Sequence, residues 1–279
     1  MAVATPDQAF ITKFEKDIHL TYRLMASKLR GLVRTDADVN GSTARFYKLG
    51  TVIATTKARN GEIPQSNPDH SFVTATMLDR YASIPIDKLD LEKMNEDLRG
   101  TYVKAMVAAF AQPTDNDILA AMNGSTTTVT VATNLTRGDT LAISEKLDSN
   151  FVPRDGRRFC VVTPHAWSFL MSIDQFVRSD YNGPDDLPFK KQGMSVRTWN
   201  DLHWFVHPGL TGVGTSAATC FAWHMDSVGH GINADLQTMW DWQIEKWQWL
   251  CAGAMSMGAA LINTAGVVKF AVNDTTALP

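Results

Sequence analysis

The sequence predicts an α+β protein, in which helices and strands occupy separate stretches of the chain. Two stretches, residues 5–31 and 87–112, carry apolar residues at helical spacing. Residues 41–86 between them contain Thr, Val and Ile segments, and a long β region lies near the C-terminus. The 279 residues are 44% hydrophobic and 20% charged, which is typical of a packed globular protein and excludes wholesale disorder.

The charge balance argues against a protein that binds polyanions through its overall charge. Lys and Arg total 26 against 29 Asp and Glu, so the net charge is −3 and no global basic field attracts nucleic acid or acidic membranes. Three cysteines are too few for a disulfide framework, which favours a reducing compartment. The N-terminus lacks the pattern of a signal peptide, and the nearly apolar run 250–262 is too short to cross a bilayer, so we expect no membrane segment.

An amphipathic helix is predicted near the N-terminus. Thr5-Pro6 is a helix-start signal, and apolar residues then recur every three or four positions until Gly31: Phe10, Phe14, Ile18, Tyr22, Met25 and Leu29. This stripe packs either on its own domain or on a neighbouring subunit, and the sequence leaves both options open. In the second case Phe10, Phe14 and Ile18 are candidate intersubunit contacts.

A long two-stranded arm is predicted over residues 41–86. Its middle is polar, Asn60-Gly61 is a strong turn signal, and two prolines resist helix. One hairpin alone has little core, so such an arm needs another surface to lie upon. The charged residues near its tip, Lys57, Arg59 and Glu62, are candidate contacts with an adjacent subunit.

A second, longer helix is predicted after the arm. Asp87 and Asp90 supply capping carboxylates, and the helical period continues until Gln112-Pro113 stops it. A helix of some 22 residues is roughly 33 Å long, which is the scale of a small domain. A shorter helix is expected at residues 116–122.

The remainder mixes strands with short helices. We expect strands at TTTVTVAT, RRFCVVT, MSVRTWNDLHWFVHPGL, CFAWHM and GVVKFAV, and helices at Asp139–Leu147 and from Pro164 to Ile173. In the long β region Trp240, Trp242 and Ile244 alternate, and Trp247, Trp249 and Cys251 alternate one step out of phase. This slip predicts a β-bulge at Glu245-Lys246.

No pattern of residues predicts catalysis, a cofactor or a metal site. His203 and His207 lie on one face of a strand, but side chains four apart on a strand are about 13 Å apart, too far to share an ion. Cys160 lies inside an apolar strand, where a neutral buried thiol is expected. Neither a dinucleotide-binding nor a phosphate-binding glycine motif occurs. We therefore expect a protein that is not an enzyme.

Particular residues fit a known order of elements. Phe46, Leu49 and Gly50 enter the extended loop, Ile86-Asp87 and Asp90 precede the long helix, RRFCVVTPHAWSFL reads strand-Pro-helix, and Gly266-Val267-Val268-Lys269 opens the final strand. In these features nearly the whole chain resembles the major capsid proteins of tailed bacteriophages, which have the Hong Kong 97-type shell fold. The resemblance implies an N-terminal arm with helix (1–40), an extended loop (41–86), a peripheral domain with a long spine helix (87–123 and 232–279) and an axial α/β domain (124–231).

The resemblance also implies a function. The chain would form hexamers and pentamers that enclose double-stranded DNA in an icosahedral head, without sequence-specific binding. Scaffolding, portal and decoration proteins would be its partners, the host cytoplasm its place of assembly and the virion its location. Two alternatives stay open: an encapsulin-like cellular compartment shell, or a soluble enzyme that uses His203, His207 or Cys160.

Overall fold

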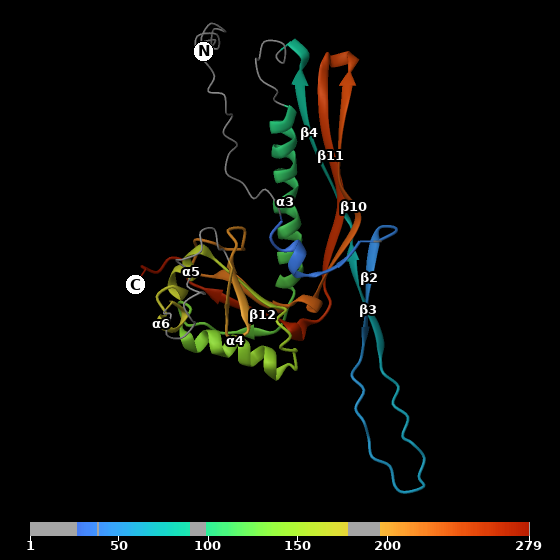
Figure 1. The fold of residues 1–279 in the computed structure, drawn as a ribbon, viewed down its shortest axis with the longest axis vertical. Coiled ribbons are helices and arrows are strands. Elements are labelled where there is room, and N and C mark those ends of the chain that lie inside the picture. Colours follow the sequence, from blue (N-terminus) through green and yellow to red (C-terminus); the bar gives the residue numbers. More distant parts are fainter. Residues whose placement is uncertain (1–26, 38, 90–98, 178–195, 279) are drawn as a thin grey trace.

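The computed structural model describes residues 27–37, 39–89, 99–177 and 196–278 (Figure 1). It is a mixed α+β structure with three sheets, whose strand orders are β1-β10-β11-β4, β5-β12-β9-β6-β8-β7 and β2-β3. The predicted fold class is therefore confirmed. The four-stranded and six-stranded sheets lie beside one another, and the two-stranded sheet extends away from both as a narrow projection (Figure 1).

The four-stranded sheet packs against one long helix. Its strands are β1 (Arg34–Asp36), β10 (Val228–Gln243), β11 (Gln248–Leu261) and β4 (Leu78–Asp87). The helix α3 (Arg99–Asn123) lies along this sheet (Figure 1), with Met106 and Phe110 packed against Cys251 and Met255 of β11. At Gly253 an added Cβ would come within 2.8 Å of Met106 and Phe110, so the absent side chain lets the helix seat closely.

Helix α3 continues through the proline that was predicted to end it. Pro113 lies in the interior of the helix, which absorbs the separate helix expected at residues 116–122. An internal proline removes one helical hydrogen bond and costs about 3 kcal/mol in isolation. Phe110 and Met106 before Pro113 and Ile118 and Met122 after it are all buried, so packing on both sides offsets that cost.

The slip in tryptophan alternation is a chain reversal rather than a bulge. Ile244–Lys246 form a 3-10 turn, and Trp247 has a φ of 54°, in the left-handed region. Strands β10 and β11 are therefore the two arms of one long hairpin in which Trp242 pairs with Trp249. Alternation predicts the face of each residue but does not reveal a turn that has no Gly, Pro or Asn signal.

The six-stranded sheet holds the largest core. Its strands are β5 (Thr128–Val129), β12 (Val267–Val272), β9 (Ala218–His224), β6 (Arg158–Val162), β8 (Leu202–Val206) and β7 (Val196–Trp199). Helices α4 (Arg137–Ser149), α5 (Pro164–Leu170) and α6 (Asp174–Val177) accompany it. Thr136 and Asp139 form a capping box for α4, and Thr163 caps α5, whose first residue is the predicted Pro164. The helix expected to reach Ile173 ends at Leu170.

Two strands pair outside the domains to which the sequence analysis assigned their residues. Residues 41–86 were assigned to the extended loop, but β4 pairs along its whole length with β11. The range 232–279 was assigned to the peripheral domain, but β12 pairs with β9 and β5 in the six-stranded sheet. Strand pairing depends on contacts distant in sequence, which composition does not encode.

The base of the extended loop is a regular hairpin. Strands β2 (Thr43–Leu49) and β3 (His70–Thr76) pair in one register, and their buried side chains pack on the lower part of the four-stranded sheet. At Gly229 an added Cβ would lie 2.7 Å from the Phe46 ring, so the hairpin approaches the backbone of β10 directly. Residues 50–69 continue as a loop that projects from this base (Figure 1).

The predicted N-terminal helix lies mostly outside the described residues, as do Phe10, Phe14 and Ile18. Its predicted end is not α-helical, because Arg30–Leu32 form a 3-10 turn. Leu29 is fully buried in the large core, and Trp223 Nε1 donates to the Leu32 carbonyl at 3.0 Å. In the described part of the chain no helix is long and apolar enough to cross a membrane.

Candidate functional site

The projecting loop is the first candidate site. Asn60 adopts a φ of 63° and the Gly61 amide donates to the Ala58 carbonyl at 2.9 Å, which confirms the predicted turn. Lys57 Nζ donates to the Gly61 carbonyl at 3.2 Å, so this candidate residue supports the turn of its own loop. Arg59 and Glu62 are exposed. The loop therefore presents its charged tip to solvent within a single subunit.

The same projection exposes large apolar side chains. Tyr47 and Phe72 pair across the hairpin on its solvent face, where Arg45 also stacks over Phe72 at 5.2 Å. Beyond them Ile53 and Ile63 are each 74% exposed. Several clustered apolar residues on a slender projection are typical of a surface that another protein covers. Sequence reasoning selected the charged tip and missed this apolar set.

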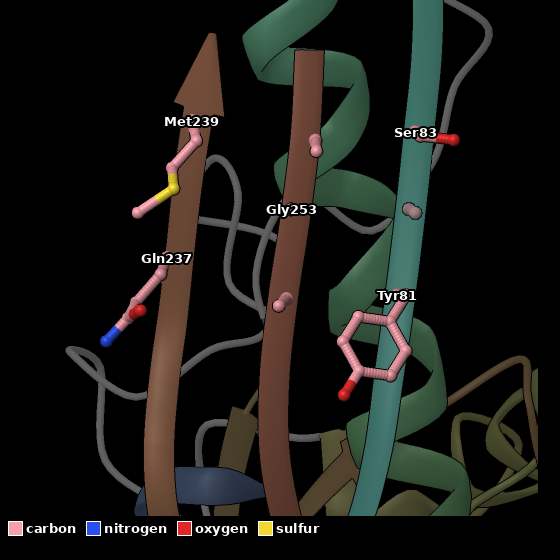
Figure 2. A pocket seen from close by; sticks show the side chains of 8 residues that line it. Tyr81, Ser83, Gln237, Met239 and Gly253 are labelled. Atoms are coloured by element: carbon pink, nitrogen blue, oxygen red, sulfur yellow. The ribbon is translucent and has the colours of Figure 1, made fainter. Parts of the chain in front are cut away.

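A shallow trough lies on the four-stranded sheet, on the face opposite α3 (Figure 2). Ala252 and Ala254 of β11 form its floor, and its volume is 230 Å³. Tyr81 of β4 and Met239 of β10 flank it and are 78% and 69% exposed. Small side chains in the centre with large ones on either side leave a groove suited to an extended segment. The alternation in LDRYASIP would have placed Tyr81 on this face.

A buried polar cluster joins the N-terminal segment to both large sheets. Asp115 of α3 accepts hydrogen bonds from Ser27 Oγ (2.5 Å), the Lys28 amide (3.2 Å), the Leu29 amide (3.1 Å) and His207 Nε2 (3.0 Å). The Gly209 amide donates to His207 Nδ1 at 3.0 Å, which assigns the donated proton to Nε2. The cluster fixes residues 27–29 against α3 and the segment that follows β8.

Electrostatics in this cluster favour an ionised carboxylate. Burial raises the pKa of Asp115, but the hydrogen bonds from His207, Ser27 and the two amides outweigh burial and hold the pKa below its ordinary value. Asp115 and His207 are both fully buried. No sequence motif marks this pair, because the residues are 92 positions apart.

The residues considered for catalysis are either engaged in hydrogen bonds within the fold or buried. His203 uses both ring nitrogens, with Thr198 Oγ1 at 2.8 Å and the Gly156 carbonyl at 2.9 Å. Cys160 is fully buried, and burial raises the pKa of its thiol well above the ordinary value. His203 therefore links neighbouring segments at the half-buried surface of the six-stranded sheet, and Cys160 lies in its core. The described residues contain no group of three metal-binding side chains.

Comparison with known proteins places the chain among shell proteins. A family model described as phage capsid protein matches residues 7–273. No curated protein sequence matches the chain. The capsid structure of cyanophage P-SCSP1u is similar with a TM-score of 0.74 and 13% identity, over 97% of this chain and 95% of that one.

Two further solved structures agree. The mature capsid of bacteriophage PhiM1 is similar with a TM-score of 0.69 and 14% identity, over 96% of this chain and 93% of that one. The capsid of the native GTA particle is similar with a TM-score of 0.70 and 11% identity, over 98% of this chain and 100% of that one. At these identities the likeness shows a shared fold, and the coverage shows that it extends over entire chains.

Proposed function

The chain belongs to the phage capsid protein family, and we propose that its projecting loop and peripheral sheet are the surfaces by which its copies hold one another in the shell. The protein is a major capsid protein with the Hong Kong 97-type fold, and it is a structural component of the virion. The predicted resemblance is therefore confirmed. The family match does not favour the encapsulin-like alternative.

The proposal also covers how the shell assembles. In the host cytoplasm the copies form hexamers and pentamers around double-stranded DNA, assisted by scaffolding, portal and decoration proteins. The four-stranded sheet with α3 is the peripheral domain, and the six-stranded sheet is the axial domain. A net charge of −3 suits a shell that encloses DNA without sequence-specific binding.

One observation carries the proposal. The loop at residues 50–69 has almost no contact with its own subunit beyond the hairpin base, yet it exposes Ile53 and Ile63. Exposed apolar groups on a segment with no core of its own gain burial only from another molecule. In a shell, each contact of this kind is repeated at every copy, so small gains per subunit add up.

The test is assembly of the purified chain, alone and with the scaffolding protein of its phage if it has one. Electron micrographs should show closed shells or rings of fixed size. A protein that stays monomeric in all these conditions contradicts the proposal. A shell that fills with a specific enzyme rather than DNA contradicts its phage-head part.

A further inference from the structure

Strand β4 has a free edge. Within the described chain its ladder partner is β11, and it ends the order β1-β10-β11-β4. The Lys88 amide donates to the Trp247 carbonyl at 3.4 Å in the same register, so even-numbered residues of β4 direct their main-chain groups toward β11. Pro85 has no amide proton. Because it is odd-numbered, its nitrogen faces away from β11, and no hydrogen bond of the ladder is lost.

The odd-numbered residues of β4 therefore direct their main chain outward. Asp79, Tyr81 and Ser83 present amide and carbonyl groups along one line, and their side chains are exposed. An edge of this length is a template for another strand unless something covers it. Pro85 has no amide proton to donate, so the amides of Asp79, Tyr81 and Ser83 are the ones that can hold an added strand.

A second stretch of the same chain has strand sequence without a strand. Residues 51–56 read TVIATT, in which five of six side chains are β-branched, and all six are exposed. They follow β2 directly but belong to no ladder in the described residues. The returning half of the loop carries Pro64 and Pro68, which lack amide protons and make it the poorer partner for an added strand.

The two unpaired stretches cannot meet within one subunit. Strand β4 follows β3 after one residue and runs away from the loop, while residues 51–56 lie beyond the opposite end of the hairpin (Figure 1). Residues 70–79 alone separate the two by roughly 30 Å of extended chain. Any pairing between them therefore joins two molecules.

We propose that residues 51–56 of a second copy add as a strand to the free edge of β4, opposite residues 79–85. The inference rests on the proposed function and names the partner of that surface. Six strand residues extend about 20 Å, which matches the length of residues 79–85. Val52 and Ile53 point to opposite faces of an added strand, so one of them lies beside Tyr81 at the trough in Figure 2.

Hydrogen exchange tests the pairing at single residues. In assembled shells the amides of Asp79, Tyr81 and Ser83 should exchange at least about tenfold more slowly than in free subunits, because only an added strand accepts from them. The amides of Arg80 and Ala82, which face β11, should be protected in both states. If shells form and the odd-numbered amides still exchange freely, the strand addition is wrong while the shell function stands.

A proline scan provides the second measurement. Proline is substituted in turn at Val52, Ile53, Ala54 and Thr55, where the subunit itself loses no ladder bond. Positions of one parity should reduce shell yield at least about tenfold and those of the other parity much less, because only alternate amides face a partner strand. Gln65→Pro in the returning half is the matched control and should assemble normally. Equal effects at all four positions contradict strand addition, and a native chain that forms no shell overturns both proposals.

Discussion

At the scale of single residues, Asp115 is the polar group with the widest structural role. It accepts four hydrogen bonds from two parts of the chain that lie far apart in sequence, residues 27–29 and His207. Removing the carboxylate leaves the buried His207 Nε2 and two amides without their acceptor, and an unsatisfied buried donor costs about 1–3 kcal/mol. Its contribution therefore exceeds that of the exposed ion pairs.

We expect Asp115→Ala to lower the free energy of unfolding of the subunit by about 3 kcal/mol or more. Chemical denaturation of unassembled protein measures this loss. Asp117→Ala, two residues along the same helix, removes the partly buried pair with Arg80 and should cost less, about 1 kcal/mol. Equal losses in the two variants would show that the buried cluster contributes no more to the free energy of unfolding than the pair of Asp117 with Arg80.

Asp148 gives a pH prediction with a definite sign. The hydrogen bond from Arg154 lowers the pKa of Asp148, burial opposes it, and Arg158 also lowers it, so that together they bring the pKa from the ordinary 3.8 to about 2. A lowered pKa contributes stability that is complete above pH 3.8 and is lost as the pH falls toward 2. Stability curves of the native chain and Asp148→Asn should therefore converge between these values. A difference that stays constant with pH contradicts the assignment.

At the scale of elements, α3 and the projecting loop show opposite relations to the core. Helix α3 is held by packing along its length and tolerates Pro113. The loop has strand-forming sequence but no ladder and no core. A substitution in the helix should therefore act on folding, and one in the loop on assembly.

Pro113→Ala should raise the thermal stability of the subunit, because it restores one helical amide at a position where proline costs about 3 kcal/mol and alanine is the best helix former. Thermal unfolding of unassembled protein is the measurement. A lower melting temperature would show that the sheet has adapted to a bend at the proline.

Replacing Arg59 to Asp69 by a short Gly-Ser turn should leave a soluble subunit that melts cooperatively, because this segment is exposed and adds little to the core. The same variant should not form stable shells. Calorimetry and micrographs of one preparation give both results. Normal shells would show that the tip is not an intersubunit element, and loss of folding would show that it is part of the core.

At the scale of the whole molecule, two packed bodies share one chain that crosses between them several times. Strand β10 begins beside the six-stranded sheet and ends at the far tip of the peripheral hairpin (Figure 1). At that tip the Trp242 ring contacts those of Trp247 and Trp249, with ring centroids 5.3 Å and 5.2 Å apart. These aromatic contacts stiffen the end of the long hairpin.

Metal removal should leave the whole assembly unchanged. His203 and His207 each use both ring nitrogens in hydrogen bonds within the fold, so neither is available to a metal without breaking a contact. Adding a strong chelator should change neither the melting temperature nor the shells. Stoichiometric zinc found by elemental analysis of purified shells would contradict this expectation.

The sequence by itself determined the features with local causes. Helical period predicted α3, Pro164 predicted the start of α5, and Asn60-Gly61 predicted the loop turn, because helix-start and turn chemistry act over a few residues. The order of these elements was enough to indicate the shell fold. The polar texture around the turn also indicated a projection without a core.

The tertiary structure alone decided the features that depend on distant contacts. It carried α3 through Pro113, turned the tryptophan slip into a hairpin, and paired β12 with β9, so that Val267 lies opposite Trp223. It also brought Asp115 to His207 and, among the described residues, left the β4 edge and residues 51–56 without a ladder partner. Packing and strand pairing add up many weak interactions between segments that are far apart in sequence. Their sum overrides the local propensity of a short stretch.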